Sequence, residues 1–236
     1  MARSSAGRRL RGVVTDVDGT LTDASRRLDP AALALVRRLR DRGLPVTLAT
    51  GNVLPIALAL QRFLGTRGPI VAENGGIIFW PGDRGGTVER RADRSVALAA
   101  WRALRQSGLP ARRLFTDRWR ETEVALEPTV PVAEVRRRLR GHRVAVESTG
   151  YAIHLMERGT GKLPSLAVAL ARIGLTPADC VILGDGDNDV AMLRAAGHSV
   201  SFPSGSVRAR RAARYVTRAD FAAGFVEGLK ESGILG

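Results

Sequence analysis

Two acid-rich runs in the sequence have the composition of a site for a hard metal ion. The first is DVDGTLT at residues 16–22, and the second is GDGDND at residues 184–189. Each comes directly after a short apolar run that is typical of a buried strand. Carboxylates at such a position need a cation or hydrogen-bond donors, and a set of oxygen ligands suits Mg²⁺ better than a soft metal.

Each run also has an ordinary structural explanation. Asp-Gly pairs are common in turns, and an aspartate before a helix is a common N-cap. One run alone would leave the two explanations balanced, whereas two runs after strands of one sheet favour a metal site. An EF-hand loop is a poorer explanation, because Val190 stands at the sixth loop position, where the turn needs glycine.

Thr50 and Lys162 could complete such a site by binding an anion. Thr50 and Gly51 follow an apolar run, and Lys162 stands at the start of a helical pattern. Only Lys162 and Lys230 are lysines among the 37 lysines and arginines of the chain. A compact ammonium beside a helix N-terminus favours an anion, with an ordinary turn and a chance lysine as the alternatives.

An alternation of strands and helices would bring these residues to one edge of a sheet. Asp29 and Pro30 open a helix that Gly43 ends. Strands are predicted at 13–16, 45–49, 69–72, 180–183 and 198–202, and further helices at 53–63, 162–172, 188–196 and 221–231. This alternation is typical of a parallel sheet wrapped by helices, in which ligands bind at the carboxyl ends of the strands.

The middle of the chain has a different pattern. Helices are predicted at 95–106 and 131–140, a strand at 123–126, and a hairpin of strands at 143–147 and 151–156 around Ser148, Thr149 and Gly150. The predicted fold is therefore α/β, with a Rossmann-like parallel-sheet core at residues 1–82 and 157–236. An inserted α+β cap domain at residues 83–156 interrupts this core.

Composition excludes several other classes of protein. The 236 residues are 44% hydrophobic, which is enough for a core. No apolar run reaches the roughly 20 residues that span a bilayer. The single cysteine, Cys180, excludes an internal disulfide and a zinc site made of cysteines, and the 3 histidines, which share no ligand spacing, are predicted to be structural. The basic N-terminus lacks the apolar region of a secretory signal, so a cytoplasmic location is expected.

The formal net charge of +14 has two explanations. It could attract anionic ligands, nucleic acid included, or it could reflect a coding bias towards arginine. The arginines are scattered over the whole length, and aromatic residues make up only 5% of the chain. Nucleic-acid binding, which favours a charged face with interleaved aromatic residues, is therefore disfavoured.

The four motifs together resemble those of the haloacid dehalogenase superfamily. DxDGTxT at 16–22, Thr50-Gly51, Lys162 and GDxxND at 184–189 stand in the order of its four motifs. The position of the insert, between the second and third motifs, resembles the subgroup with an α/β cap at that point. The run 16–23, the run ENGG at 73–76 and the short chain resemble the archaeal-type phosphoglycolate phosphatases. Relatives more often have an acidic residue before the lysine and a glycine after it, where this chain has Gly161 and Leu163.

The resemblance implies a Mg²⁺-dependent phosphatase that forms an aspartyl-phosphate. Asp16 would attack phosphorus, and Asp18 would protonate the leaving group and later deprotonate water. The metal ligands would be Asp16, the backbone carbonyl of Asp18, Asp185 and Asp189.

The remaining motif residues would bind the phosphate. Thr50 would donate a hydrogen bond to a phosphoryl oxygen, and Lys162 would offset its charge. Gly19 and Gly51 would let backbone N–H groups approach it. Asn188 is placed in the substrate-binding set, where it would orient Lys162 or a metal ligand.

The predicted substrate is a small phosphorylated metabolite, 2-phosphoglycolate by resemblance. The nearest alternative is a sugar-phosphate phosphatase of the sucrose-phosphate or mannosyl-phosphoglycerate type, because related caps occur there. The alternative from another class is a basic nucleic-acid-binding protein. No membrane partner is expected, and a homodimer is one oligomeric state that the sequence allows.

Overall fold

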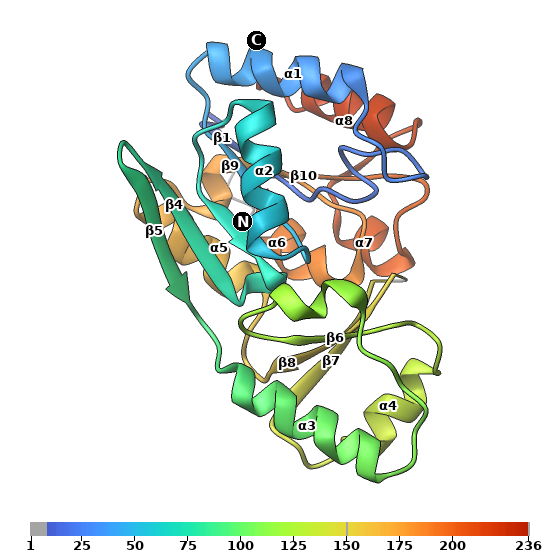
Figure 1. The fold of residues 1–236 in the computed structure, drawn as a ribbon. Coiled ribbons are helices and arrows are strands. Elements are labelled where there is room, and N and C mark those ends of the chain that lie inside the picture. Colours follow the sequence, from blue (N-terminus) through green and yellow to red (C-terminus); the bar gives the residue numbers. More distant parts are fainter. Residues whose placement is uncertain (1–8, 150, 236) are drawn as a thin grey trace, which may run out of the picture.

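The core of the protein is one eight-stranded sheet. The computed structural model describes residues 9–149 and 151–235 (Figure 1). The strand order is β11-β10-β9-β1-β2-β3-β4-β5. Neighbouring strands from β11 to β3 are parallel, whereas β4 is antiparallel to both β3 and β5. The strands are β1 (Gly12–Thr15), β2 (Val46–Ala49), β3 (Ile70–Ala72), β4 (Ile77–Gly82), β5 (Gly85–Arg90), β9 (Cys180–Leu183), β10 (His198–Ser201) and β11 (Tyr215–Val216).

Helices cover both faces of this sheet. One apolar cluster joins the sheet to α1 (Pro30–Asp41), α2 (Leu54–Leu64) and α8 (Phe221–Glu231), and another joins it to α5 (Lys162–Ala171), α6 (Val190–Ala195) and α7 (Val207–Ala212). Val13 belongs to the first cluster and Val14 to the second, as the alternation of a strand requires. Because both faces are buried, the central strands are mostly apolar, with Thr15 and Thr47 as buried exceptions in β1 and β2.

A second, smaller sheet forms the inserted cap. It is antiparallel, with the order β6 (Val124–Leu126), β8 (Ile153–Glu157) and β7 (Val144–Ser148). The helices α3 (Arg94–Gln106) and α4 (Val132–Arg138) share an apolar cluster with it. Short 3₁₀ turns are η1 (Glu73–Gly75), η2 (Phe115–Trp119), η3 (Pro177–Asp179) and η4 (Asp187–Asp189). In Figure 1 the cap lies beside one end of the core.

The fold class predicted from the sequence is confirmed. A Rossmann-like core of alternating strands and helices carries an α+β insertion. Local chemistry at the start of α1 agrees with the prediction, because the Asp29 side chain accepts a hydrogen bond from the Ala31 N–H at 2.7 Å and Pro30 is the first helical residue. The turn residue Gly150 of the predicted hairpin and residues 1–8 of the basic N-terminus lie outside the described residues.

The segment 83–90 lies in the core sheet rather than in the cap. The turn-rich run from Pro81 to Gly86 predicts that this segment begins the insertion. In the structure β5 pairs with β4 along the edge of the large sheet. We therefore propose that the inserted unit begins at residue 91 and ends near residue 156. None of the helices in the described part of the chain is long and apolar enough to cross a membrane.

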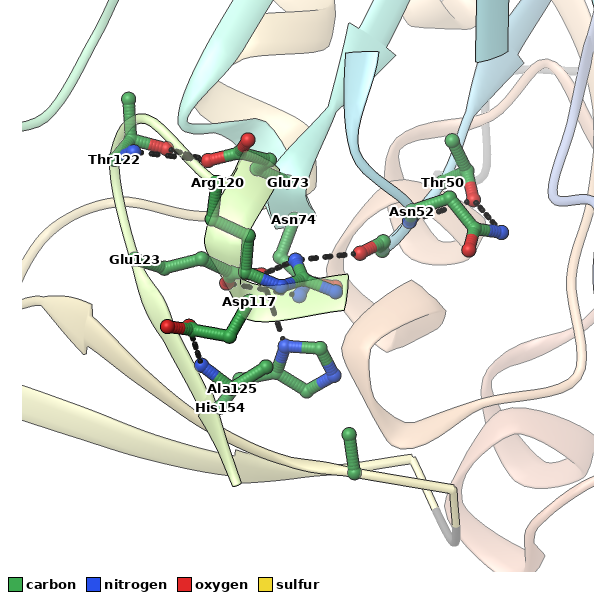
Figure 2. Close-up of polar contacts among 12 residues, drawn as sticks. Thr50, Asn52, Glu73, Asn74, Asp117, Arg120, Thr122, Glu123, Ala125 and His154 are labelled. Atoms are coloured by element: carbon green, nitrogen blue, oxygen red, sulfur yellow. Dashed lines mark hydrogen bonds and ion pairs between the residues drawn. The ribbon is translucent and has the colours of Figure 1, made fainter. Parts of the chain in front are cut away.

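Glu73 fastens the cap to the core. Its side chain is buried and accepts hydrogen bonds from the Glu121 N–H at 3.0 Å, the Thr122 N–H at 2.9 Å and the Thr122 hydroxyl at 2.6 Å (Figure 2). Glu73 itself has a φ of 49°, an uncommon value for a residue with a side chain. This strained backbone indicates that the contact orders the connection between the two sheets.

Removing the Glu73 carboxylate is expected to destabilise the protein. Glu73→Ala would leave the donors of Glu121 and Thr122 without their acceptor, which should lower the free energy of unfolding by about 2 kcal/mol. Thermal unfolding should then show a midpoint roughly 4–8 °C lower. Glu121→Ala is the matched control, because its half-exposed side chain pairs only with Arg90 in the described residues. Equal midpoints for the two variants would contradict this role of Glu73.

Candidate active site

Asp16 lies at the carboxyl end of β1, next to a buried lysine. The Lys162 Nζ donates to Asp16 Oδ1 at 2.6 Å and to Asp189 Oδ1 at 2.7 Å. Lys162 is the first residue of α5, and its side chain is 1% exposed. One ammonium therefore bridges two carboxylates that are 146 and 27 residues away in the chain.

The third carboxylate of the cluster comes from the loop after β9. Oxygen atoms of Asp16, Asp185 and Asp189 all lie within 4.8 Å of one another. The second oxygen of Asp189 accepts from the backbone N–H groups of Asp185 at 3.1 Å and Gly186 at 2.9 Å, which fixes the loop around it. The two acid-rich runs thus meet because β1 and β9 are parallel neighbours that end together.

The cluster holds more negative charge than Lys162 can balance. Burial, more than any other effect, raises the pKa of Asp16 well above its ordinary value, and Asp189 and Asp185 raise it further against the pull of Lys162. Burial and the nearby Asp189 raise the pKa of Asp185 to about 7. Burial would lower the pKa of Lys162, but Asp16 and Asp189 outweigh it and the pKa rises. A buried, oxygen-only set with excess negative charge fits a hard divalent cation.

Asn52, which the sequence motifs do not single out, joins Asp18 and Thr50. The Asn52 side-chain amide donates to Asp18 Oδ2 at 2.7 Å and to Thr50 Oγ1 at 3.2 Å, and the Asn52 backbone N–H donates to the same Oγ1 at 3.0 Å (Figure 2 shows Thr50 with Asn52). No described residue accepts the Thr50 hydroxyl proton, so that proton can be donated to a ligand. Asn52 two residues after Thr50 resembles an ordinary turn residue, which is why its type gave no signal.

Gly19 holds a position that strongly favours glycine. Its φ is 77°, and a Cβ there would lie 2.5 Å from Asp185 Oδ2. The resemblance implies that glycine here lets backbone N–H groups approach the phosphate; the N–H of Gly19 itself donates to the Thr22 hydroxyl at 3.0 Å. The glycine therefore allows the first acid-rich run to pack against the second, while the Gly51 N–H forms no hydrogen bond among the described residues.

Asn188 and Asp187 lie differently from the other residues of their run. The Asn188 amide donates to Asn74 Oδ1 at 2.9 Å, and within the described chain no hydrogen bond joins it to Lys162 or to the acidic cluster. Asp187 turns away and accepts from the Ser206 hydroxyl at 2.6 Å and from Arg208 at 3.1 Å. Asn74, which sequence analysis did not single out as a site residue, is thus the direct partner of Asn188.

A hollow of about 560 Å³ opens above these residues, between core and cap. Its core wall includes Asp16, Asp18 and Asp185, and its cap wall includes Arg120 and His154. Three acidic groups of the core thus share the hollow with Arg120 and Arg136 of the cap, whose wall also includes Glu147. The sequence predicts a structural role for His154, and its position in a strand gave no sign that it would line this hollow.

A family model of haloacid dehalogenase-like hydrolases matches residues 13–112 and 127–229. The protein belongs to this family. Hydrolases of this family generally use a divalent metal, which agrees with the acidic cluster of Asp16, Asp185 and Asp189.

Relatives that are named phosphoglycolate phosphatase show that this hydrolase is a phosphatase. The chain is 38% identical over 212 residues to a phosphoglycolate phosphatase of Methanopyrus kandleri, and the aligned region covers 88% of this chain and 90% of the relative. It is 34% identical over 221 residues to a phosphoglycolate phosphatase of Methanospirillum hungatei, with 92% and 94% covered.

Solved structures agree on the fold of the hydrolase. A crystal structure of a Thermoplasma acidophilum protein superposes with a TM-score of 0.85 at 26% identity, over 96% of this chain and 99% of that chain. A sugar phosphatase of subclass IIB in the same superfamily superposes with a TM-score of 0.76 at 17% identity, over 95% and 99%. At that identity the sugar phosphatase supports the shared fold alone.

Proposed function

We propose that this hydrolase is a Mg²⁺-dependent phosphatase that converts 2-phosphoglycolate to glycolate and phosphate through an aspartyl-phosphate on Asp16. The observation that carries the proposal is the meeting of the Asp16, Asp185 and Asp189 oxygens within 4.8 Å, beside the Lys162 ammonium. The relatives named phosphoglycolate phosphatase support the substrate.

The metal would be held by Asp16, Asp185 and Asp189, with the backbone carbonyl of Asp18. When bound, Mg²⁺ supplies positive charge that keeps the carboxylates ionised and offsets the charge of the phosphoryl oxygens. Lys162 donates a hydrogen bond to Asp16 Oδ1 at 2.6 Å, so the carboxylate is fixed before a substrate arrives.

Hydrolysis takes place in two displacements. In the first, an Asp16 oxygen forms a bond to phosphorus while the bond from phosphorus to the ester oxygen breaks, and protonated Asp18 gives its proton to the departing glycolate oxygen. In the second, water attacks phosphorus, Asp18 takes the water proton, and the bond to Asp16 breaks. Asn52 keeps Asp18 in place for both proton transfers through its 2.7 Å hydrogen bond.

The phosphoryl oxygens are bound by groups at the ends of β2 and α5. The Thr50 hydroxyl proton and the Gly51 N–H have no acceptor in the described residues, and Lys162 adds a charge nearby. Asn188 acts through Asn74, with which it forms a 2.9 Å hydrogen bond, and so supports the wall of the site rather than binding the phosphate.

A panel of phosphate esters tests this function. With Mg²⁺ present, kcat/KM for 2-phosphoglycolate should exceed that for hexose phosphates by at least about tenfold, as expected for one modest charged contact. Excess EDTA should abolish turnover, and added Mg²⁺ should restore it. The hollow of about 560 Å³ would admit larger esters, so their exclusion is a real test. Equal or inverted specificity would favour a sugar phosphatase. A salt-dependent gel shift with nucleic acid and no hydrolysis would favour the binding protein.

A further inference from the structure

A buried group of charged side chains in the cap faces the active site and has no role in the chemistry above. It consists of Arg120, Glu123 and His154, whose side chains are 3%, 1% and 3% exposed. Arg120 and His154 line the same hollow as Asp16 and Asp18 (Figure 2 shows the group beside Thr50 and Asn52). Even a well-paired buried ion pair contributes little to stability on average, so we look for a functional role of this group.

Glu123 is the anchor of this group. It pairs with Arg120, accepts from His154 Nδ1 at 2.9 Å and accepts from the Asn74 amide at 3.1 Å. Burial would raise the pKa of Glu123, but His154 and Arg120 outweigh it and the pKa falls to about 2. An ionised carboxylate only accepts hydrogen bonds, so His154 Nδ1 carries a proton. The His154 Nε2 atom has no partner among the described residues.

Arg120 has donor capacity that the protein does not use. Its Nη1 contacts Glu123 and donates to the Gly51 carbonyl at 3.0 Å. Its Nε is buried and has no hydrogen-bond partner in the described residues. A buried N–H without a partner is costly. The Nη2 group also forms no hydrogen bond among the described residues, so a ligand carboxylate can bind the guanidinium through this group.

The position of Arg120 sets the size of the ligand. Gly51 directly follows Thr50, so the guanidinium lies one peptide unit from the hydroxyl proposed to bind the phosphate. A second anionic group bound at Arg120 would therefore lie close to a phosphate bound at Thr50. A two-carbon phosphate ester with a terminal carboxylate could supply such a group, whereas the hydroxyl end of a hexose phosphate would offer the guanidinium no anionic acceptor besides Glu123.

The other cations on the wall of the hollow are already engaged and more exposed. The Arg26 guanidinium lies 3.7 Å from the centre of the Tyr151 ring. Arg136 donates twice to the Val146 carbonyl, at 3.2 and 3.0 Å. Exposed charges are screened by water, so the buried Arg120 should discriminate most strongly between substrates.

We propose that Arg120, with His154 beside it and Glu123 fixing both, binds the carboxylate of the substrate and so makes the enzyme specific for small phosphate esters with a carboxylate one carbon from the ester oxygen. The inference rests on the proposed function, because it names the residues that bind the carboxylate of the proposed substrate. Glu123 and Asn74 are positioning residues that act through this pair.

The test compares two substrates of equal length, 2-phosphoglycolate and 2-hydroxyethyl phosphate, which lacks the carboxylate. The wild-type ratio of kcat/KM values should favour 2-phosphoglycolate by about 10²-fold. Arg120→Gln should reduce this ratio by at least about tenfold, through KM for 2-phosphoglycolate, and leave 2-hydroxyethyl phosphate within roughly threefold. His154→Gln should reduce the ratio less. Arg136→Gln, the same substitution on the same wall, should leave the ratio unchanged.

Three outcomes would overturn the inference while the phosphatase function stands. In the first, Arg120→Gln lowers kcat/KM equally for both substrates, which would make Arg120 structural. In the second, Arg136→Gln changes the ratio and Arg120→Gln does not. In the third, Arg120→Lys, which keeps the charge and is measured if the Gln variant fails to fold, lowers kcat/KM equally for both substrates. By contrast, a wild-type enzyme that hydrolyses 2-hydroxyethyl phosphate but not 2-phosphoglycolate would overturn the proposed substrate itself.

Discussion

Asp16→Asn is expected to lower kcat for phosphate esters by at least about 10⁴-fold, or about 5.5 kcal/mol in the barrier. Asparagine has the shape of aspartate and can still accept the 2.6 Å hydrogen bond from Lys162, so the fold should remain. It cannot form the bond to phosphorus. Acid quenching during turnover should trap a phosphorylated peptide containing Asp16 in the wild type and none in the variant, as detected by mass spectrometry.

Asp187→Asn is the matched control for this experiment. Asp187 belongs to the second acid-rich run, but its carboxylate pairs with Ser206 and Arg208 outside the cluster. Its substitution should change kcat by less than about threefold, because its ion pair with the exposed Arg208 is partly open to solvent and such a pair contributes little. A rate for Asp16→Asn within tenfold of the wild type would exclude covalent catalysis by Asp16. A large loss for Asp187→Asn would show that any charge change in this region impairs the enzyme.

The meeting of the two acid-rich runs could be predicted because it follows from local pattern and parallel topology. Apolar runs ending in Asp16 and Asp185 have the composition of strands buried on both faces. In the structure Thr15 of β1 pairs with Leu183 of β9, so the residues that follow them are neighbours. The amide of Asn188 and the direction of Asp187 could not be predicted, because a one-residue change of position in a tight turn decides which carboxylate faces inward.

The partners contributed by the cap could not be predicted for a different reason. Asn74 and Glu123 form a hydrogen bond across 49 residues, and Arg120 reaches the Gly51 carbonyl across 69. Asn74 has a φ of 53°, which fits a turn residue as well as a site residue. Such pairings depend on how the two sheets dock, and neither periodicity nor composition encodes that. The strand β5 was missed because glycine and proline at 81–86 favour turns, while its pairing with β4 uses backbone groups.

Lys162→Met is expected to lower kcat by about 10²–10³-fold. Methionine matches the length of the lysine stem but removes the ammonium that lies 2.6 Å from Asp16 and 2.7 Å from Asp189. Two buried carboxylates would then lose their shared cation, so the variant should also unfold more easily in EDTA than in Mg²⁺. Lys230→Met is the matched control, because Lys230 is exposed in the last turn of α8, and its activity and stability should not change.

Lys162→Arg tests whether positive charge at position 162 is sufficient for activity without the shape of lysine. Only two of the 37 lysines and arginines of the chain are lysines, so the lysine at position 162 departs from a general preference for arginine. The ammonium is a compact point charge that donates to two carboxylates within a side chain that is 1% exposed, whereas the planar guanidinium is larger and needs a wider space. We therefore expect Lys162→Arg to lose at least about tenfold in kcat despite its retained charge, because overpacking displaces Asp16 from the line of attack. Wild-type kcat for Lys162→Arg, measured with saturating Mg²⁺, would show that charge alone suffices and that the two lysines of this chain reflect chance.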